Sequence, residues 1–201
     1  MLLIDSCACS IKQGPFALTA LLFPYLNRDG YGARIINVSS MAHKFVKGMD
    51  MSNLNSEKHY NGRGWEAYGQ SKLENILFTQ ELQRRADAAG MNWLTVTCLH
   101  PGVVGTDIWR NTPLVSKTSS ALTSTLFYNR MLTTEEGANT QVFLATATSS
   151  TDNKQTTPIA KGQYYNEYGQ VPQLVNYARD PIKAKELWKA SERLSGVEFK
   201  L

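Results

Sequence analysis

The stretch WEAYGQSKLENILFTQELQRRADAAG, residues 65–90, predicts a long amphipathic helix around which the rest of the chain is organised. Its apolar residues recur at helical spacing, and Gly90 marks its end. Tyr68 and Lys72 lie four residues apart, so their side chains share one face of this helix. An ammonium group beside a phenol favours the phenolate, which makes the phenol a usable proton donor or acceptor near neutral pH. Ordinary surface packing is the alternative interpretation of the pair.

Runs typical of strands and of helices alternate along the chain. The strand-like runs, rich in β-branched and aromatic residues, are RIINV (34–38), WLTVTCL (93–99) and Gly162–Tyr165. Further helices are predicted to begin at Gly14-Pro15, at the capping box Thr133-x-x-Glu136, and at Asp180-Pro181. The alternation predicts an α/β fold, with about three parallel strands in a doubly wound sheet covered by helices on both faces.

We expect a single domain over residues 1–201, because the chain is long enough for one sizeable core and short for two. Residues 1–13 form an atypical lead-in that fits no clear element. The Ser/Thr-rich segment 105–130 has no strong pattern either. Loops of that length are usually lids, binding loops or disordered segments, so we interpret it as a substrate loop.

Composition argues against several classes of function. The net charge of +4 comes from dispersed Lys and Arg, which gives little support for nucleic-acid binding. The three cysteines and three histidines lack the spacing of a metal site or a disulfide framework. No apolar run approaches the roughly 20 residues that a membrane span needs. A cytoplasmic protein is therefore expected, with peripheral membrane contact left open.

Three polar features fall at the carboxyl ends of the predicted strands, the edge at which open α/β sheets bind ligands. Ser39-Ser40 ends the first strand, PGVVGT (101–106) ends the second, and the helix between them carries Tyr68 and Lys72. A Ser hydroxyl can hydrogen-bond a substrate oxygen, and a Tyr can give or take its proton. Hydride must come from a cofactor, since no side chain can supply it. The arrangement favours the reduction of a carbonyl or the oxidation of an alcohol. Neither Ser lies in a G-x-S-x-G elbow, which argues against a serine hydrolase.

With Tyr68-Gly69-Gln70-Ser71-Lys72 as a Tyr-x-x-x-Lys motif, the sequence resembles the short-chain dehydrogenase/reductase family. Four passages resemble its retinol-dehydrogenase-like branch in particular. They are RIINVSSMAH (34–43), YGQSKLENILFTQEL (68–82), LHPGVVGTDI (99–108) and the tail YYNEYGQ…LWKASERLSG (164–196). The resemblance covers residues 14–198 and implies a Rossmann-like fold with NAD or NADP as cofactor.

The resemblance also implies roles for individual residues. Ser40 would orient the substrate, Tyr68 would be the catalytic acid/base, and Lys72 would lower the pKa of Tyr68 and bind the nicotinamide ribose. Val104 would offer its backbone to the nicotinamide carboxamide, and Thr106 would lie near the cofactor phosphates. The implied substrate is a lipophilic alcohol or carbonyl compound, such as a retinoid- or steroid-like molecule, and a homo-oligomer is left open. The full implied cofactor-binding set is Tyr68, Lys72, Pro101, Gly102, Val104 and Thr106.

The sequence departs from the family pattern at its N-terminal side. It contains neither the Gly-rich turn T-G-x-x-x-G-x-G nor an Asn-Asn-Ala-Gly stretch, and Ile11 stands where the family has its fourth catalytic residue, an Asn. We therefore expect the adenine half of the dinucleotide site to be missing. We also expect the strand at 34–38 to have an open outer edge, which predicts marginal stability. The alternative function is that of a truncated, inactive relative that is unstable or acts by subunit pairing.

Overall fold

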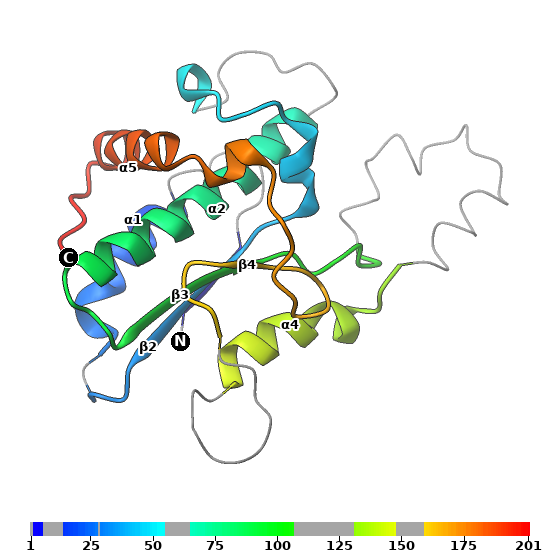
Figure 1. Cartoon of the computed structure of the whole chain (residues 1–201), viewed down its shortest axis with the longest axis horizontal. Helices are drawn as coiled ribbons and strands as arrows, with labels where there is room; N and C mark the ends of the chain where they lie inside the picture. Colours follow the sequence, from blue (N-terminus) through cyan, green and yellow to red (C-terminus); the bar gives the residue numbers. More distant parts are fainter. Residues whose placement is uncertain (1, 6–13, 28, 55–64, 107–130, 148–158) are drawn as a thin grey trace, which may run out of the picture.

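Four parallel strands form one sheet in the order β1-β2-β3-β4 (Figure 1). The structure is a computed structural model that describes residues 2–5, 14–27, 29–54, 65–106, 131–147 and 159–201. The three predicted strands are confirmed, and β1 is an addition to them. The strands are β1 (Leu2–Asp5), β2 (Ala33–Val38), β3 (Leu94–Leu99) and β4 (Tyr164–Tyr165).

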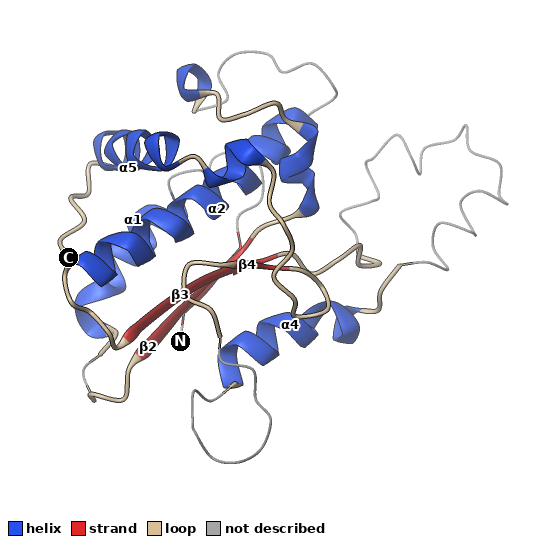
Figure 2. Cartoon of the chain, viewed as in Figure 1, coloured by secondary structure: helices blue, strands red, loops and turns tan. Residues whose placement is uncertain are grey.

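Helices cover both faces of this sheet, with α1, α2 and α5 on one face and α4 on the other (Figure 2). The predicted α/β fold with a covered parallel sheet is therefore confirmed. Among the described helices, none combines the length and the apolarity needed to cross a membrane. The helices are α1 (Gly14–Leu22), α2 (Trp65–Ala88), α4 (Thr134–Thr146) and α5 (Pro181–Ser195), and the short 3-10 helices are η1 (Phe23–Tyr25), η2 (Met41–Phe45), η3 (Met51–Asn53) and η5 (Asn176–Arg179).

The residues of strand β2 from Ile35 to Val38 are all buried, because both faces of the strand are covered. Ile35 and Ile36 are each 0% exposed although their side chains point to opposite sides of the sheet. Ile35 packs in the cluster formed with α1, α2 and α5, and Ile36 packs with Leu144 of α4. Helices on both faces thus bury the apolar side chains on the two sides of this strand.

The helix starts follow the capping signals in the sequence. The Thr133 hydroxyl accepts a hydrogen bond from the Glu136 N–H, and the Glu136 carboxylate accepts one from the Thr133 N–H, so the predicted capping box of α4 is confirmed. The Asp180 carboxylate accepts hydrogen bonds from the N–H groups of Ile182 and Lys183 at the start of α5. Both helices therefore begin where local chemistry satisfies their first N–H groups.

Two expectations about the N-terminal side are wrong. Residues 2–5 of the lead-in form β1, which pairs with β2 over Leu2–Asp5 and Ile35–Val38. The outer edge of β2 is therefore paired, and within the described part of the chain β1 is the edge strand on this side of the sheet. The prediction of marginal stability rested on an open edge of β2, and the pairing with β1 removes that reason for it. Ile11, the lead-in residues 6–13 and residues 107–130 of the expected substrate loop lie outside the described residues.

Candidate functional site

Lys72 lies in α2 against the carboxyl end of β2. Its ammonium nitrogen donates a hydrogen bond to the Val38 carbonyl oxygen at 3.2 Å and lies 5.4 Å from the centroid of the Tyr68 ring. The Lys72 residue is only 2% exposed, whereas Tyr68 is partly exposed. Ordinary surface packing therefore does not describe this pair, because a buried ammonium has to be held by specific acceptors.

Ser39 and Ser40 lie beside the same turn of α2. The Ser39 hydroxyl is buried and donates a 2.7 Å hydrogen bond to the Lys72 carbonyl oxygen. The Ser40 oxygen accepts a hydrogen bond from the Ala42 N–H at 3.2 Å and so caps η2. A hydroxyl that accepts in this way still has its own O–H to donate. Ser40 can therefore offer a hydrogen to a neighbouring oxygen without losing its capping role.

Gly69 brings η2 close to α2 because it has no side chain. A Cβ at this position would lie 2.6 Å from the Ala42 carbonyl oxygen and 3.0 Å from the Val46 side chain. Both of these atoms belong to the segment that starts at Ser40. The close approach places the Ser40 end of η2 against the turn of α2 that carries Tyr68.

The turn after β3 adjoins the end of β2, since the Ser39 N–H donates to the Leu99 carbonyl oxygen at 2.6 Å. Pro101, Gly102 and Val104 are half-buried in this turn, and Thr106 is exposed. The residues on either side of Val104 pair with Leu132, so the N–H and C=O of Val104 point away from Leu132. All the predicted site residues thus follow or flank the carboxyl ends of β2 and β3.

Three residues that contribute to this edge were missed from the sequence. The Asn75 side chain donates a 3.0 Å hydrogen bond to the Val38 carbonyl oxygen, which Lys72 also uses. His100 Nε2 lies 3.1 Å from a carboxylate oxygen of Glu167. Each partner is distant in sequence, so no local spacing signals these pairs. His100 is itself buried, directly after the last residue of β3.

A layer of buried titratable groups lies behind the site. The Tyr164 ring contacts the His43 ring at 5.2 Å and the His100 ring at 5.7 Å between centroids. Burial lowers the pKa of His43 and of His100 below the usual histidine range, and it raises the pKa of the Tyr164 phenol. Burial also raises the pKa of the Cys98 thiol to about 12. These four groups are therefore neutral at physiological pH.

Aromatic rings lead from the surface to Tyr68. The Phe45 ring lies 6.0 Å from the Trp65 ring, which lies 5.9 Å from the Tyr68 ring, and both pairs are edge-to-face. Phe45 is 61% exposed and Met41, at the start of η2, is 38% exposed. Apolar surface that stays exposed next to a polar centre is a common mark of a binding site.

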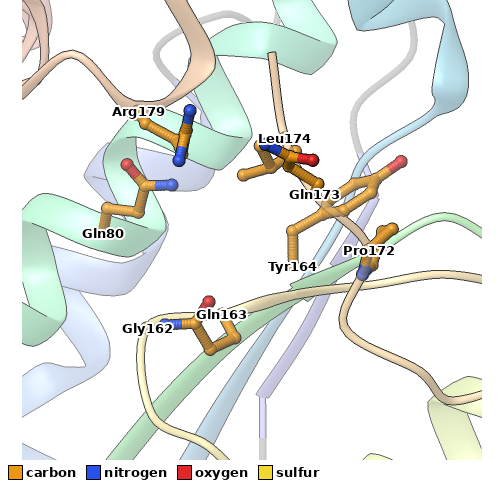
Figure 3. A pocket seen from close by; sticks show the side chains of 8 residues that line it. All are labelled: Gln80, Gly162, Gln163, Tyr164, Pro172, Gln173, Leu174 and Arg179. Carbon is orange, nitrogen blue, oxygen red and sulfur yellow. The ribbon is translucent and has the colours of Figure 1, made fainter. Parts of the chain in front are cut away.

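A separate pocket of about 280 Å³ is lined in part by Tyr164, and none of the predicted site residues lines it. Gln80 of α2 and Arg179 of η5 lie on one side of it, facing Gly162 and Gln163 (Figure 3). Gln80 donates a hydrogen bond to the Ala178 carbonyl oxygen, and Arg179 donates one to the Asn176 side chain. Two polar side chains that line the pocket, Gln80 and Arg179, are thus already hydrogen-bonded within the protein.

The donor set at the sheet edge fits one end of a dinucleotide. A phenol, an ammonium group and a serine hydroxyl suit the nicotinamide ribose and the reacting oxygen of a substrate. The diphosphate end needs a Gly-rich turn at a helix N-terminus, and the 201 residues contain no such turn. The residues that are present therefore fit the nicotinamide half only.

Known proteins similar to this chain carry dehydrogenase names. No protein-family model matches the chain. It is 37% identical to retinol dehydrogenase 13 of Homo sapiens over 92% of its own length and 52% of that protein. It is 33% identical to polyprenol dehydrogenase of Mus musculus over 92% of its own length and 51% of that protein. The chain thus spans about half the length of the curated relatives it matches.

Solved structures share the fold of this chain. A crystal structure of an uncharacterized protein from Mycobacterium paratuberculosis is 30% identical, with a TM-score of 0.62 over 94% of this chain and 58% of that one. The NADPH-bound carbonyl reductase from chicken fatty liver is 17% identical and shares the fold, with a TM-score of 0.50 over 86% of this chain and 65% of that one. Over about half the length of these relatives, the chain is therefore similar to proteins named as retinol and polyprenol dehydrogenases, and it shares the fold of a carbonyl reductase.

Proposed function

We propose that this chain, as a single incomplete Rossmann-like domain, carries the acid/base centre of an NAD(P)-dependent oxidoreductase for lipophilic alcohols or carbonyl compounds. The observation that carries the proposal is the placement of the Lys72 ammonium between the Val38 carbonyl oxygen and the Tyr68 ring. Burying an ammonium group costs free energy, so a lysine in this position needs a compensating role. Holding the phenol and binding a ribose hydroxyl would be that role.

In the reductive direction, the Tyr68 hydroxyl donates its proton to the carbonyl oxygen of the substrate. The Ser40 hydroxyl donates a hydrogen bond to the same oxygen and so orients it. A bound NAD(P)H would supply the hydride that reaches the carbonyl carbon. Lys72 keeps Tyr68 in place, while Pro101, Gly102, Val104 and Thr106 line the side on which the nicotinamide would lie. The oxidation of an alcohol runs through the same groups in reverse.

A lipophilic substrate, such as a retinoid- or steroid-like compound, is supported by the aromatic surface next to Tyr68. Phe45, Trp65 and Tyr68 form a continuous edge-to-face row, and Phe45 is largely exposed. Aromatic rings bind extended apolar ligands well because they offer large contact areas with little loss of conformational entropy. Similar proteins named for retinol and polyprenol, both lipophilic alcohols, support the same substrate class.

The test is a titration of the purified chain with NADPH, followed by cofactor fluorescence. We expect saturable binding that Lys72→Met weakens at least about tenfold, since the substitution removes a charge-assisted hydrogen bond worth about 1.5–3 kcal/mol. Lys189→Met is the matched control, because Lys189 is an exposed lysine on α5 and its loss should leave the affinity unchanged. No binding at millimolar NADPH would rule out the proposal for this chain.

A second candidate function is that of an inactive relative that acts by pairing with another subunit. It is favoured by the lack of a Gly-rich turn in the sequence and by the exposed apolar side chains of Leu18, Leu21 and Leu22 on α1. This candidate predicts no NADPH binding together with a dimeric mass in analytical ultracentrifugation. A monomer that binds NADPH would exclude it.

A further inference from the structure

The His100 imidazole ring connects the turn after β3 to Glu167. Its Nδ1 accepts a hydrogen bond from the Gly102 N–H at 3.1 Å, so this nitrogen carries no proton. The proton of the neutral ring is then on Nε2, which lies 3.1 Å from a Glu167 carboxylate oxygen and donates to it. One ring thus holds the backbone of the turn with one nitrogen and the carboxylate with the other.

Glu167 is itself fixed from two sides. The Thr140 hydroxyl of α4 donates to the Glu167 carbonyl oxygen at 3.0 Å and to the Asn166 carbonyl oxygen at 3.1 Å. The Asn166 side chain accepts hydrogen bonds from the N–H groups of Tyr168 and Gln170, which closes the turn around Glu167. These hydrogen bonds fix the backbone of Glu167 and so limit the positions that its carboxylate can take next to His100.

Gly102 leaves no space for the turn to shift toward Glu167. Its φ of +84° lies in the left-handed region, where glycine is favoured. A Cβ there would lie 2.6 Å from the Leu132 side chain and 3.2 Å from the Glu167 Cβ. The conformation of the turn thus depends on close packing and on the hydrogen bond that His100 accepts.

The same cluster reaches the substrate side of the site. The Tyr164 ring stacks on the His100 ring and meets the His43 ring edge-on. His43 Nδ1 lies 2.7 Å from the Ser40 carbonyl oxygen. The rings of His100, Tyr164 and His43 therefore connect the end of β3 with the end of β2.

We propose that His100 and Glu167 are positioning residues that hold the Pro101–Val104 turn in its cofactor-binding conformation, and that protonation of His100 releases this turn. The effect on the turn is a property of the chain itself, whereas the consequence for cofactor binding rests on the proposed function. When Nδ1 gains a proton it can no longer accept, and two N–H groups then face each other. The Gly102 N–H loses its acceptor, which favours a different conformation of the turn.

The charged and titratable groups around His100 set the pH at which this happens. They are Glu167 on the turn after β4, Tyr164 on β4, and His43 and Lys44 on η2. Burial is the largest cause and lowers the pKa of His100, Glu167 opposes it, and Lys44 adds to the lowering. Release is therefore expected below about pH 6.5, the ordinary histidine value.

The primary test is NMR spectroscopy of the ¹⁵N-labelled chain without cofactor. We expect the His100 ring nitrogens and the Gly102 backbone amide to titrate together, with one midpoint below pH 6.5. His100→Asn offers a carbonyl oxygen near the position of Nδ1 and cannot titrate, so the Gly102 amide should stay in place at all pH values. Glu167→Gln should lower the midpoint, whereas the exposed control Glu186→Gln should not. If His100→Asn fails to fold, the Glu167→Gln midpoint decides.

A Gly102 amide that does not move as His100 titrates, or that still titrates in His100→Asn, would overturn the proposal. A second readout is NADPH affinity, compared between wild type and His100→Asn at each pH so that titration of the cofactor cancels. We expect wild type to lose about three- to tenfold relative to the variant below the midpoint, the effect of one hydrogen bond. Absence of NADPH binding at any pH would remove the proposed function, and the NMR result would still decide the positioning of the turn.

Discussion

The Lys72 ammonium nitrogen lies 3.2 Å from the Val38 carbonyl oxygen, which also accepts a hydrogen bond from Asn75 at 3.0 Å. One carbonyl group, on the last residue of β2, thus anchors two side chains of α2. Strand and helix are thereby fixed to each other at the turn that carries Tyr68. The relationship gives the lysine a defined position before any ligand binds.

Tyr68→Phe should abolish carbonyl reduction and leave cofactor affinity nearly unchanged. The substitution removes the proton donor, and general acid catalysis contributes about 10²- to 10⁴-fold in rate. The ring itself remains, so its contacts with Trp65 and Lys72 persist. The measurement is steady-state reduction of retinal by NADPH, with the exposed Tyr25→Phe as the control. A rate within tenfold of wild type would contradict the role of Tyr68.

Stability should fall as the pH is lowered through the range below about 6.5. The pKa values of His43 and His100 are lowered in the folded chain, so the unfolded chain binds more protons just below pH 6.5. Their contribution is therefore complete above pH 6.5 and declines by up to about 1.4 kcal/mol per pH unit for each histidine. Urea unfolding at pH 7.5, 6.5 and 5.5 measures it. His100→Asn should flatten the decline, and a constant free energy of unfolding would contradict the prediction.

Arg34→Lys should destabilise the chain by about 1–2 kcal/mol, because lysine cannot reproduce a forked set of hydrogen bonds. The Arg34 guanidinium donates to the carbonyl oxygens of Leu144, Ala145 and Ala147 at the end of α4. No basic residue lies in the last turn of α4 itself, so this strand residue supplies the missing donors. Urea unfolding checks the effect against the exposed control Arg193→Lys. Equal stability of Arg34→Lys and wild type would show that the charge alone suffices.

Trp188→Ala should cost about 3–5 kcal/mol, a large part of the stability of a small domain. The Trp188 ring is 2% exposed, stacks on Phe78 and Phe199 at 5.9 and 4.9 Å, and lies 4.3 Å below the Arg85 guanidinium. Trp188→Phe should cost less because a ring remains in the cluster. Thermal unfolding followed by circular dichroism measures both, and Tyr31→Ala, at a residue 95% exposed, should stay within about 0.5 kcal/mol.

Much of the fold could be predicted because its signals are local. The capping box at Thr133 and the Asp180-Pro181 start depend on contacts within one helical turn. Strand β1 was missed because four residues give no period, and its partners in β2 lie more than thirty positions later. Pairing in a parallel sheet depends on packing that a short segment does not encode.

Within the candidate site, too, residues with a local sequence signal could be predicted and residues that depend on tertiary contacts could not. Ser40, Tyr68 and Lys72 could be found because a motif and the parallel topology place them at one edge, while their roles remain predictions. The pair His100 and Glu167 could not be found, because 67 positions separate the two residues and neither has a distinctive neighbour. Tertiary contacts between turns leave no trace in residue spacing.

Gly69 has a consequence for the design of variants. The close approach of η2 to α2 requires a glycine here, since a single methyl group at residue 69 would meet the Ala42 carbonyl oxygen at 2.6 Å. Even the smallest side chain at residue 69 would therefore have to move the backbone of η2 away from α2. A residue that touches neither Ser40 nor Tyr68 through a side chain thus controls how closely their two segments approach.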